Sequence, residues 1–326
     1  MLVPEISLTT QMISRFYSRF GSRVAIFHSG LSNGEKYDEY LKIYRNEIDI
    51  VVGTRSAVFT PLKNIGLIVL DEEHSETFKQ DSNPRYNAVD MAIFRGKYNN
   101  CPVILGSATP SLEAMARARK GIFKLIVMPN RVGGAVLPQI EIVDMALEMK
   151  KRNTILSERL QDEIRKNLER GEQTILLLNR RGHSTIVTCQ ACGYVYKCPY
   201  CDISLTYHKT SNNLRCHYCG YTVLKDNICP ECHEEALNYM GLGTEKLEQT
   251  LKEMYKDARI VRMDVDTTSN KGSHEKIIND FKEHKYDILL GTQMISKGLD
   301  FPLVTLVGVI NADSSLNIPD FRSGER

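Results

Sequence analysis

Cysteine is the residue type with the sharpest pattern in this sequence. Eight of the nine cysteines form four Cys-x-x-Cys pairs: Cys189/Cys192, Cys198/Cys201, Cys216/Cys219 and Cys229/Cys232. A pair with this spacing presents two thiolates to one metal ion, and two pairs complete a tetrahedral four-sulfur site. The four pairs therefore predict two Zn²⁺ ions in closed structural sites, with no position left for a reactive water.

The sequence leaves open which pairs share an ion. In a nested arrangement, the outer pairs (Cys189, Cys192, Cys229, Cys232) hold one zinc and the inner pairs (Cys198, Cys201, Cys216, Cys219) hold the other. In a sequential arrangement, neighbouring pairs share an ion. A redox pair or merely buried thiols would be a serious competitor for a single Cys-x-x-Cys motif. Four motifs within 44 residues, from Cys189 to Cys232, argue against that interpretation.

The cysteine segment has little apolar material for a core. We therefore expect metal binding to supply its folding free energy, about 10–16 kcal/mol per site. Its basic residues do not outnumber its acidic ones, which argues against a phosphate-gripping finger. Its six tyrosines could stack on unpaired bases. Packing around the metal sites is the plainer explanation, and docking of a partner protein is a third.

A second set of chemically capable residues is acidic. Asp71, Glu72, Glu73 and His74 directly follow an apolar run at residues 67–70. Ligands of open α/β sheets bind at the carboxyl ends of strands, so we predict these four side chains as catalytic residues beside a nucleotide. In phosphate-loop NTPases an Asp here holds Mg²⁺ and a neighbouring group orients the attacking water. We assign Asp71 to Mg²⁺ and Glu72 to the water; the plainer interpretation is an exposed helix start.

The next apolar run, at residues 103–105, ends in Gly106-Ser107-Ala108-Thr109-Pro110. Two successive strands that end in DEEH and SAT resemble motifs II and III of superfamily 2 helicases. That resemblance implies that Ser107 and Thr109 sense the nucleotide through hydrogen bonds to the acidic loop. A capped turn into a helix that starts at Ser111 explains the same residues, and both interpretations can hold together.

The elements that must position these residues alternate along the chain. Short apolar runs at residues 24–27, 48–52, 67–70, 103–105 and 125–127 are separated by helix-like stretches, which favours a parallel sheet covered on both faces. The pattern breaks between Val132 and Pro138. An amphipathic helix then carries Leu160 and Ile164 on one face and ends at Gly171. Strand and helix alternation continues on both sides of the cysteine segment, so we predict two α/β lobes with a Cys-rich insertion in the second.

Composition bounds the class of protein. Lys and Arg number 42 against 40 Asp and Glu, so any contact with nucleic acid must come from local patches. The sequence shows no apolar run of membrane-spanning length and no signal-peptide pattern, which predicts a cytoplasmic protein. We expect a first lobe at residues 1–145, the start of a second at 146–186, the zinc insertion at 187–235, and the rest of the second lobe at 236–326.

Taken together, these motifs resemble those of the primosomal replication-restart DNA helicases, the PriA family of superfamily 2. Residues 3–9 match its motif Ia, 52–59 motif Ib, 71–74 motif II, 106–113 motif III, 178–183 motif IV and 291–302 motif V. Residues 241–245 and 262–266 match the segments that resume the second lobe. The resemblance covers essentially the whole chain, and a double-zinc insertion between motifs IV and V distinguishes this family from other superfamily 2 motors.

The resemblance implies two RecA-like lobes that use ATP with Mg²⁺ to unwind DNA in the 3′→5′ direction. It also implies work at stalled forks with primosome proteins and single-stranded-DNA-binding protein. Nucleotide contacts would come from Lys297, Gly298 and Asp300. DNA contacts would come from motifs Ia, Ib and V and from an aromatic-rich loop after motif II: Pro4, Glu5, Thr9, Thr54, Arg55, Ser56, Phe78, Lys79, Arg85, Tyr86, Thr292 and Gln293.

The sequence departs from the family in one important respect. No G-x-x-x-x-G-K-[ST] phosphate loop occurs in these 326 residues, and motif VI is expected to follow beyond Arg326. We therefore expect both lobes to be incomplete and the chain alone to lack ATPase and unwinding activity. The alternative function is a non-catalytic, zinc-stabilised module that binds DNA or primosome proteins. A third hypothesis, a superfamily 2 motor that acts on RNA, does not explain why the sequence contains the cysteine insertion.

Overall fold

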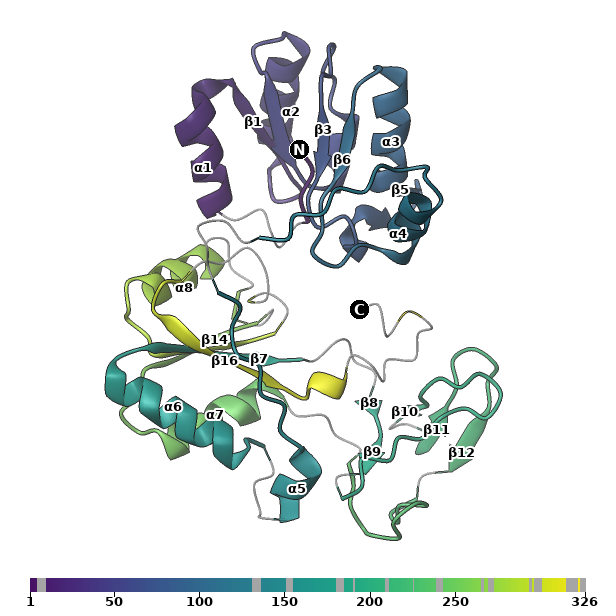
Figure 1. Cartoon of the computed structure of the whole chain (residues 1–326), viewed down its shortest axis with the longest axis vertical. Helices are drawn as coiled ribbons and strands as arrows, with labels where there is room; N and C mark the ends of the chain where they lie inside the picture. The colour runs from purple at the N-terminus through teal and green to yellow at the C-terminus, as the bar shows by residue number, and fades with distance from the viewer. Residues whose placement is uncertain are drawn as a thin grey trace. The chain divides into compact units, whose positions relative to one another are not determined.

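The computed structural model (Figure 1) describes residues 1–4, 10–130, 136–150, 155–179, 185–189, 191–208, 211–224, 226–238, 243–264, 267–268, 273–292, 295, 301–314 and 322. The chain divides into two compact units, Met1–Ala135 and Val136–Arg326. Each unit is an α/β structure built on parallel strands, as predicted. The finer domain boundaries given above stay predictions. Among the residues that the structure describes, no helix combines the length and apolar character needed to cross a membrane.

The first unit is built on two pairs of parallel strands. These are β1 (Val24–Phe27) with β2 (Ile50–Gly53), and β3 (Ile68–Leu70) with β6 (Val103–Leu105). Leu2 forms parallel bridges to both Gly53 and Leu70, so the start of the chain lies between the two pairs. The side chains of Ile43, Leu70 and Ala88 are fully buried in the core that these strands share.

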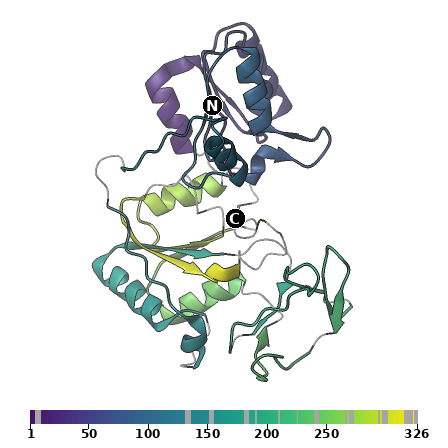
Figure 2. The same ribbon diagram turned by 45° about the vertical axis from the view of Figure 1, so that its right-hand side comes forward.

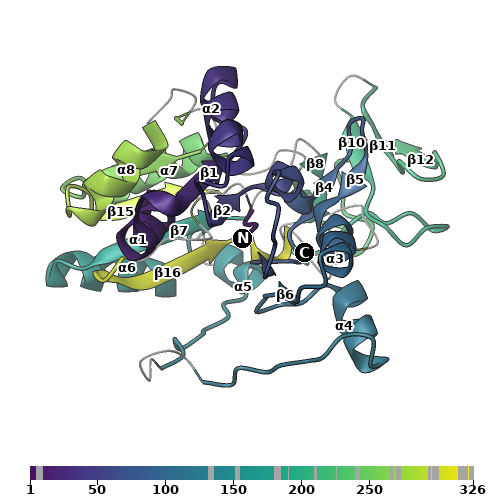
Figure 3. The same cartoon turned by 90° about the horizontal axis from the view of Figure 1, so that it is seen from above.

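Helices α1 (Thr10–Phe20), α2 (Asn33–Tyr44), α3 (Ala88–Tyr98) and α4 (Leu112–Arg119) complete the first unit. Figure 3 shows α1 and α2 on one side of it, with α3 and a short hairpin of β4 (Lys79–Gln80) and β5 (Tyr86–Asn87) on the opposite side. The hairpin projects from the unit in Figure 2. The apolar run predicted as a strand at residues 125–127 is not a strand. Its three side chains are exposed, so no sheet face covers them.

The second unit contains a four-stranded parallel sheet in the order β14-β15-β7-β16. The strands are β7 (Gln173–Leu178), β14 (Ile260–Met263), β15 (Ile288–Gly291) and β16 (Val304–Ile310). Figure 1 shows α6 (Glu158–Arg170) and α7 (Thr244–Met254) on one face of this sheet and α8 (Ser273–Lys282) on the other. One core contains Ile164 and Leu247, and a separate core contains Phe281. The α/β lobe that the alternation of strand and helix on both sides of the cysteine segment predicts is therefore confirmed.

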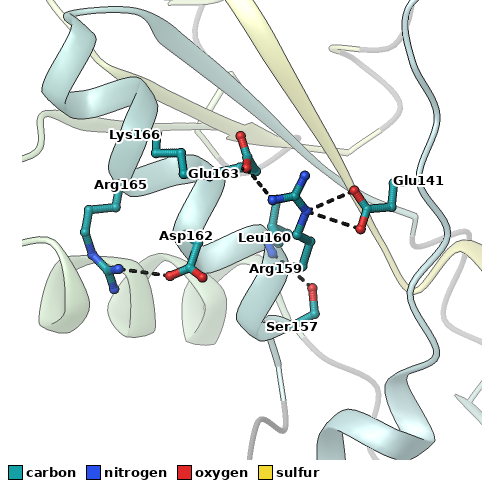
Figure 4. Close-up of polar contacts among 8 residues, drawn as sticks. All are labelled: Glu141, Ser157, Arg159, Leu160, Asp162, Glu163, Arg165 and Lys166. Atoms are coloured by element: carbon teal, nitrogen blue, oxygen red, sulfur yellow. Dashed lines mark hydrogen bonds and ion pairs between the residues drawn. The ribbon is translucent and has the colours of Figure 1, made fainter.

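Helix α6 ends at Gly171, as the sequence predicts. The hydroxyl of Ser157 accepts a hydrogen bond from the backbone N–H of Leu160 (3.2 Å), and Gly171 ends the helix with φ of 67°. Its exposed face carries ion pairs of Arg159 with Glu141 and Glu163, as Figure 4 shows. Such exposed pairs contribute only about 0–1 kcal/mol each. Burial of the apolar face is therefore the main source of this helix's stability.

The Cys-rich segment, residues 185–238, is built differently, from short antiparallel strands. One sheet has the order β12-β11-β10-β8, formed by Thr222–Leu224, Asn213–Arg215, Thr206–His208 and Thr185–Ile186. A second pair, β9 (Thr188–Cys189) with β13 (Leu237–Asn238), joins the two ends of the segment. Val187, Leu205 and Leu214 are fully buried among the cysteines and tyrosines.

Candidate metal centres and strand-end loops

All four Cys-x-x-Cys pairs fold into the same turn. In each pair, the residue after the second cysteine donates its backbone N–H to the carbonyl oxygen of the first cysteine. These bonds are Gly193 to Cys189 (2.9 Å), Asp202 to Cys198 (2.9 Å), Gly220 to Cys216 (3.0 Å) and His233 to Cys229 (2.9 Å). The donor residue has a positive φ in every case, between 53° and 79°. The repeated geometry shows that the spacing of each pair encodes its own local structure.

The eight sulfur atoms gather in two groups, one of the outer pairs and one of the inner pairs. Within each group the ligand atoms all lie within 4.8 Å of one another. The nested arrangement is therefore the one that the structure adopts, and the sequential one is not. All nine cysteines are free thiols. Contacts between sulfurs include Cys189 to Cys232 (3.6 Å) and Cys198 to Cys219 (3.4 Å). A tetrahedral zinc with Zn–S bonds of about 2.3 Å places its sulfurs about 3.8 Å apart, so the groups fit this ion.

Proton equilibria in the inner group also favour a cation. Loss of hydration, and then hydrogen bonds with Cys219 and Cys216, raise the pKa of the Cys201 thiol to about 12. For Cys216, burial raises the pKa, but backbone hydrogen bonds from Cys219 and Tyr218 outweigh it and lower the pKa to about 7. The Cys201 and Cys216 thiols therefore do not ionise together near neutral pH by themselves. A divalent cation at their centre stabilises the thiolates and removes this conflict.

In the first unit, the acidic loop that follows β3 is hydrogen-bonded to the loop that follows β6. The Nδ1 atom of His74 lies 2.7 Å from Oγ of Ser107, and that hydroxyl also accepts the backbone N–H of Thr109 (3.0 Å). Nε2 of His74 lies 3.4 Å from a carboxylate oxygen of Glu72. Glu72 itself has φ of 51°, which is uncommon for a residue other than glycine, Asn or Asp. The two strand-end loops thus form one connected polar site, at the carboxyl ends of paired parallel strands.

Glu73, one of the candidate catalytic residues, is the buried member of the acidic loop. Its side chain is only 5% exposed, and its two carboxylate oxygens accept hydrogen bonds from the backbone N–H (2.7 Å) and the hydroxyl (3.0 Å) of Ser111. The same hydroxyl caps α4 by accepting the N–H of Ala114 (3.2 Å). The backbone N–H of Glu73 donates to the carbonyl of Gly106 (3.0 Å). We therefore assign Glu73 to positioning the loop after β6 and the start of α4.

The residues predicted to contact DNA fall into two sets in the first unit. Lys79 and Ser56 are exposed, and Tyr86 is half-buried with its ring edge-on to Phe59 (4.9 Å between ring centres). A hollow of about 460 Å³ on the hairpin is lined by Lys79, Gln80, Asp81, Arg85, Tyr86 and Asn87. The second set is inaccessible.

That second set comprises Phe78, Pro4 and Thr54. Phe78 is 1% exposed and packs in the core of the first unit, so it does not stack on a base in this conformation. Pro4 and Thr54 are also buried. The reason is their place in the fold, since Pro4 lies two residues after Leu2, which bridges the strand pairs, and Thr54 directly follows β2. Their predicted DNA contacts are therefore not supported.

Several predicted residues lie outside the described part of the chain: Glu5, Thr9, Gln293, Lys297, Gly298 and Asp300. Thr292 is described; it directly follows β15, and its carbonyl accepts the N–H of Ile295 (3.1 Å). The described strand ends also include an acidic residue to which the sequence reasoning gave no role. Asp264 follows β14, is buried, and accepts hydrogen bonds from the Thr244 hydroxyl (2.8 Å) and the Thr267 N–H (3.0 Å). An acid directly after a strand, as at Asp71, is the signal that could have found it.

Comparison with protein families matches three segments of the chain. Residues 1–118 match the DEAD/DEAH box helicase family, and residues 228–323 match the helicase conserved C-terminal domain. Residues 198–223 match the Cys-rich region domain of the PriA DNA helicase. A solved structure of Mss116p bound to single-stranded RNA and AMP-PNP is 12% identical, with a TM-score of 0.52 over 100% of this chain and 56% of that one. This likeness shows the fold alone.

The fold and these matches thus define a protein of the helicase-domain class that carries a Cys-rich insertion. The replication restart protein PriA of Bacillus subtilis is 53% identical over 100% of this chain, and that of Synechocystis is 47% identical over the same share. The chain belongs to the PriA family of replication restart proteins. It spans 41% and 40% of the lengths of these two relatives.

Proposed function

We propose that this chain forms the central motor region of an ATP-driven DNA helicase that acts in replication restart. The whole protein would unwind DNA in the 3′→5′ direction and assemble the primosome at stalled forks, with primosome proteins and single-stranded-DNA-binding protein as partners. Family membership supports this proposal. The structural observation that carries it is the hydrogen-bonded connection of the DEEH and SAT loops at the ends of parallel strands.

Each residue of the connected loops has a distinct part in the proposed mechanism. Asp71 would hold the Mg²⁺ that accompanies ATP, and Glu72 would orient the attacking water. Bound Mg²⁺ would neutralise phosphate charge as the bond to the γ-phosphate breaks. The contact of His74 with Ser107 would transmit the state of the nucleotide from one loop to the other. Lys297, Gly298 and Asp300 stay proposed nucleotide contacts from motif V.

The proposed DNA contacts in the first unit are those with accessible side chains. Tyr86 lines the hollow together with Lys79 and Arg85, so its ring would stack on an unpaired base with positive charge beside it. Ser56 in the first unit, and Thr292 and Gln293 in the second, are proposed contacts to the backbone of the strand. The overall charge of +2 means that binding depends on such local cations, so it should weaken steeply with salt.

The two thiol groups would each hold a structural Zn²⁺ that fixes the Cys-rich segment. Their closed four-sulfur geometry leaves no open coordination position for a reactive water. The residues within the segment that could meet a partner are aromatic: Tyr200 and Tyr218 each lie between the cysteines of an inner pair and are exposed. Zinc would therefore act by holding this surface in shape.

Two measurements on the 326-residue chain test the proposal. Anisotropy of a labelled oligothymidine at low salt should report binding that is tighter than to a blunt duplex of the same length. Phosphate release should stay at background with and without that DNA, because the sequence holds no phosphate loop. Absence of single-strand binding would contradict the DNA-motor role. Robust DNA-stimulated hydrolysis would contradict the predicted inactivity.

The second candidate function is a zinc-stabilised binding module that uses no ATP. The lack of a phosphate loop in these residues is the observation that favours it. Binding of a fluorescent ATP analogue with Mg²⁺ distinguishes the two candidates. It is measured on the full-length protein that contains these residues. The motor predicts binding that Asp71→Asn weakens at least about tenfold, and the binding module predicts none.

A further inference from the structure

Arg55 makes contacts that its expected role does not explain. It follows β2, in the segment that was expected to grip DNA phosphates. Its Nη1 atom instead donates to the backbone carbonyls of Thr77 (3.2 Å) and Lys79 (2.7 Å). Its guanidinium carbon also lies 6.0 Å from the centre of the Tyr86 ring. The side chain is thus directed at both strands of the β4–β5 hairpin.

The hairpin needs such support because it is very short. Each of its strands has two residues, and an isolated two-stranded hairpin is marginally stable in water. Its two ends are anchored locally: Phe78 is buried in the core, and the side chain of Asn87 caps α3 by accepting the N–H of Val89 (2.8 Å). Arg55 adds two hydrogen bonds to the hairpin from a position 22 and 24 residues earlier in the chain. Because the donor is charged, these hydrogen bonds are stronger than neutral ones.

We propose that Arg55 is a positioning residue that holds the hairpin in the shape of the hollow between Lys79, Arg85 and Tyr86. In this role it acts through the hairpin and binds no DNA phosphate itself. The inference deepens the proposed function, because it rests on that hollow as the place where an unpaired base and its phosphate bind. Lysine is a poor substitute at this position, since it lacks the planar guanidinium that lies near the Tyr86 ring while its Nη1 atom bonds the two carbonyls.

Hydrogen exchange of the whole chain, without DNA, tests the positioning role. Arg55→Ala should speed exchange of the hairpin amides, residues 79–87, by about tenfold or more, and Arg55→Lys should do nearly the same. Arg45→Ala, at an exposed arginine that ends α2, is the matched control and should leave these amides unchanged. Unchanged exchange across β3 and β15 shows that each unit stays folded. Wild-type exchange of the hairpin in Arg55→Ala overturns the proposal.

The salt dependence of DNA binding separates positioning from direct contact. Each phosphate contact on a single strand adds about 0.7 to the slope of log K against log salt. Arg55→Ala should weaken oligothymidine binding about fivefold at every salt concentration while the slope stays the same. Lys79→Ala, the direct-contact comparison, should reduce the slope by about 0.7. A reduced slope in Arg55→Ala would make Arg55 a phosphate ligand and overturn the proposal.

The hydrogen-exchange experiment and the DNA-binding experiment can contradict the proposal independently of each other. If the wild-type chain binds no single strand, the DNA role of the hollow is wrong, and hydrogen exchange still decides whether Arg55 holds the hairpin. If the wild-type chain binds a single strand but Arg55→Ala keeps full affinity and normal hairpin exchange, the positioning role is wrong.

Discussion

The Cys-rich segment and the strand-end site of the first unit solve the same problem in opposite ways. Both must hold polar groups close together, four thiols in one case and the DEEH and SAT loops in the other. The Cys-rich segment uses four copies of one local turn. The strand-end site uses residues more than 30 positions apart, brought together by parallel strands with a buried core.

This difference predicts how the stability of each region responds to metal removal and to single substitutions. A structure built from local turns around metal ions should unfold when the ions are removed, while the rest of the chain stays folded. A structure built on a buried sheet should lose stability in graded steps as single contacts are removed. Four changes, from the largest expected effect to the smallest, test this contrast.

Removal of zinc should have the largest effect. Chelation should abolish hydrogen-exchange protection in β10, β11 and β12, because each site contributes about 10–16 kcal/mol of folding free energy. Protection in β7 and β15 should persist. Cys198→Ser should lose the inner zinc, whereas Cys101→Ser, outside the segment, should lose neither. Full protection of β10 to β12 in metal-free protein would show that the segment folds by burial alone.

Loss of the Glu73 carboxylate should have the next largest effect. Glu73→Ala leaves the N–H of Ser111 without its acceptor, which should lower the free energy of unfolding of the first unit by about 1–3 kcal/mol. Glu73→Gln keeps an acceptor and should cost less. Urea unfolding measures both, with Glu47→Gln at an exposed loop position as the control. A change no larger than that of the control would remove Glu73 from its positioning role.

The third change concerns the turns themselves. Gly220 has φ of 79° and open space where a Cβ would lie, so Gly220→Ala adds only backbone strain, about 1–2 kcal/mol. Zinc affinity, measured by competition with a chelator, should fall by about fivefold to thirtyfold. Gly66→Ala is the matched control, because its surroundings are equally open and its φ is not positive. Equal affinity of the two variants would show that the turn geometry is not what holds the sulfurs.

The smallest change concerns acid stability of the second unit. Burial raises the pKa of Asp264, but hydrogen bonds from Thr267 and Thr244 outweigh it and hold the pKa below the usual Asp range. A lowered pKa stabilises the fold above the unfolded value of about 3.9, and this contribution is lost as pH falls through the folded value. Asp264→Asn should therefore lower the melting temperature at pH 6, with a difference that shrinks toward pH 3. A constant difference across this range would contradict the assignment.

The same contrast explains how much the sequence could predict. The spacing of the cysteines predicts both zinc sites because each turn is local, but their pairing depends on how β9, β10, β11 and β13 meet, which spacing alone leaves open. The parallel sheets follow from apolar runs. Residues 125–127 show the limit of that pattern, since an apolar run becomes a strand only where a neighbour and a covering layer exist.

The strand-end residues show a second limit. Asp71 and Ser107 can be found from motif and position, but the use of each side chain depends on distant partners. Glu73 bonds to Ser111, Arg55 bonds to the hairpin, and Phe78 packs in the core. A motif identifies these residues as a group and does not distinguish those that contact a ligand from those that hold its surroundings.

Native mass spectrometry of freshly purified chain is the most direct test of the metal-built segment. The intact mass should exceed that of the apo chain by two Zn²⁺ ions, each of which replaces two protons at a given charge state, because each group of four sulfurs would hold one ion. A chain that carries no zinc, or that has lost eight protons to four disulfides, would contradict the account.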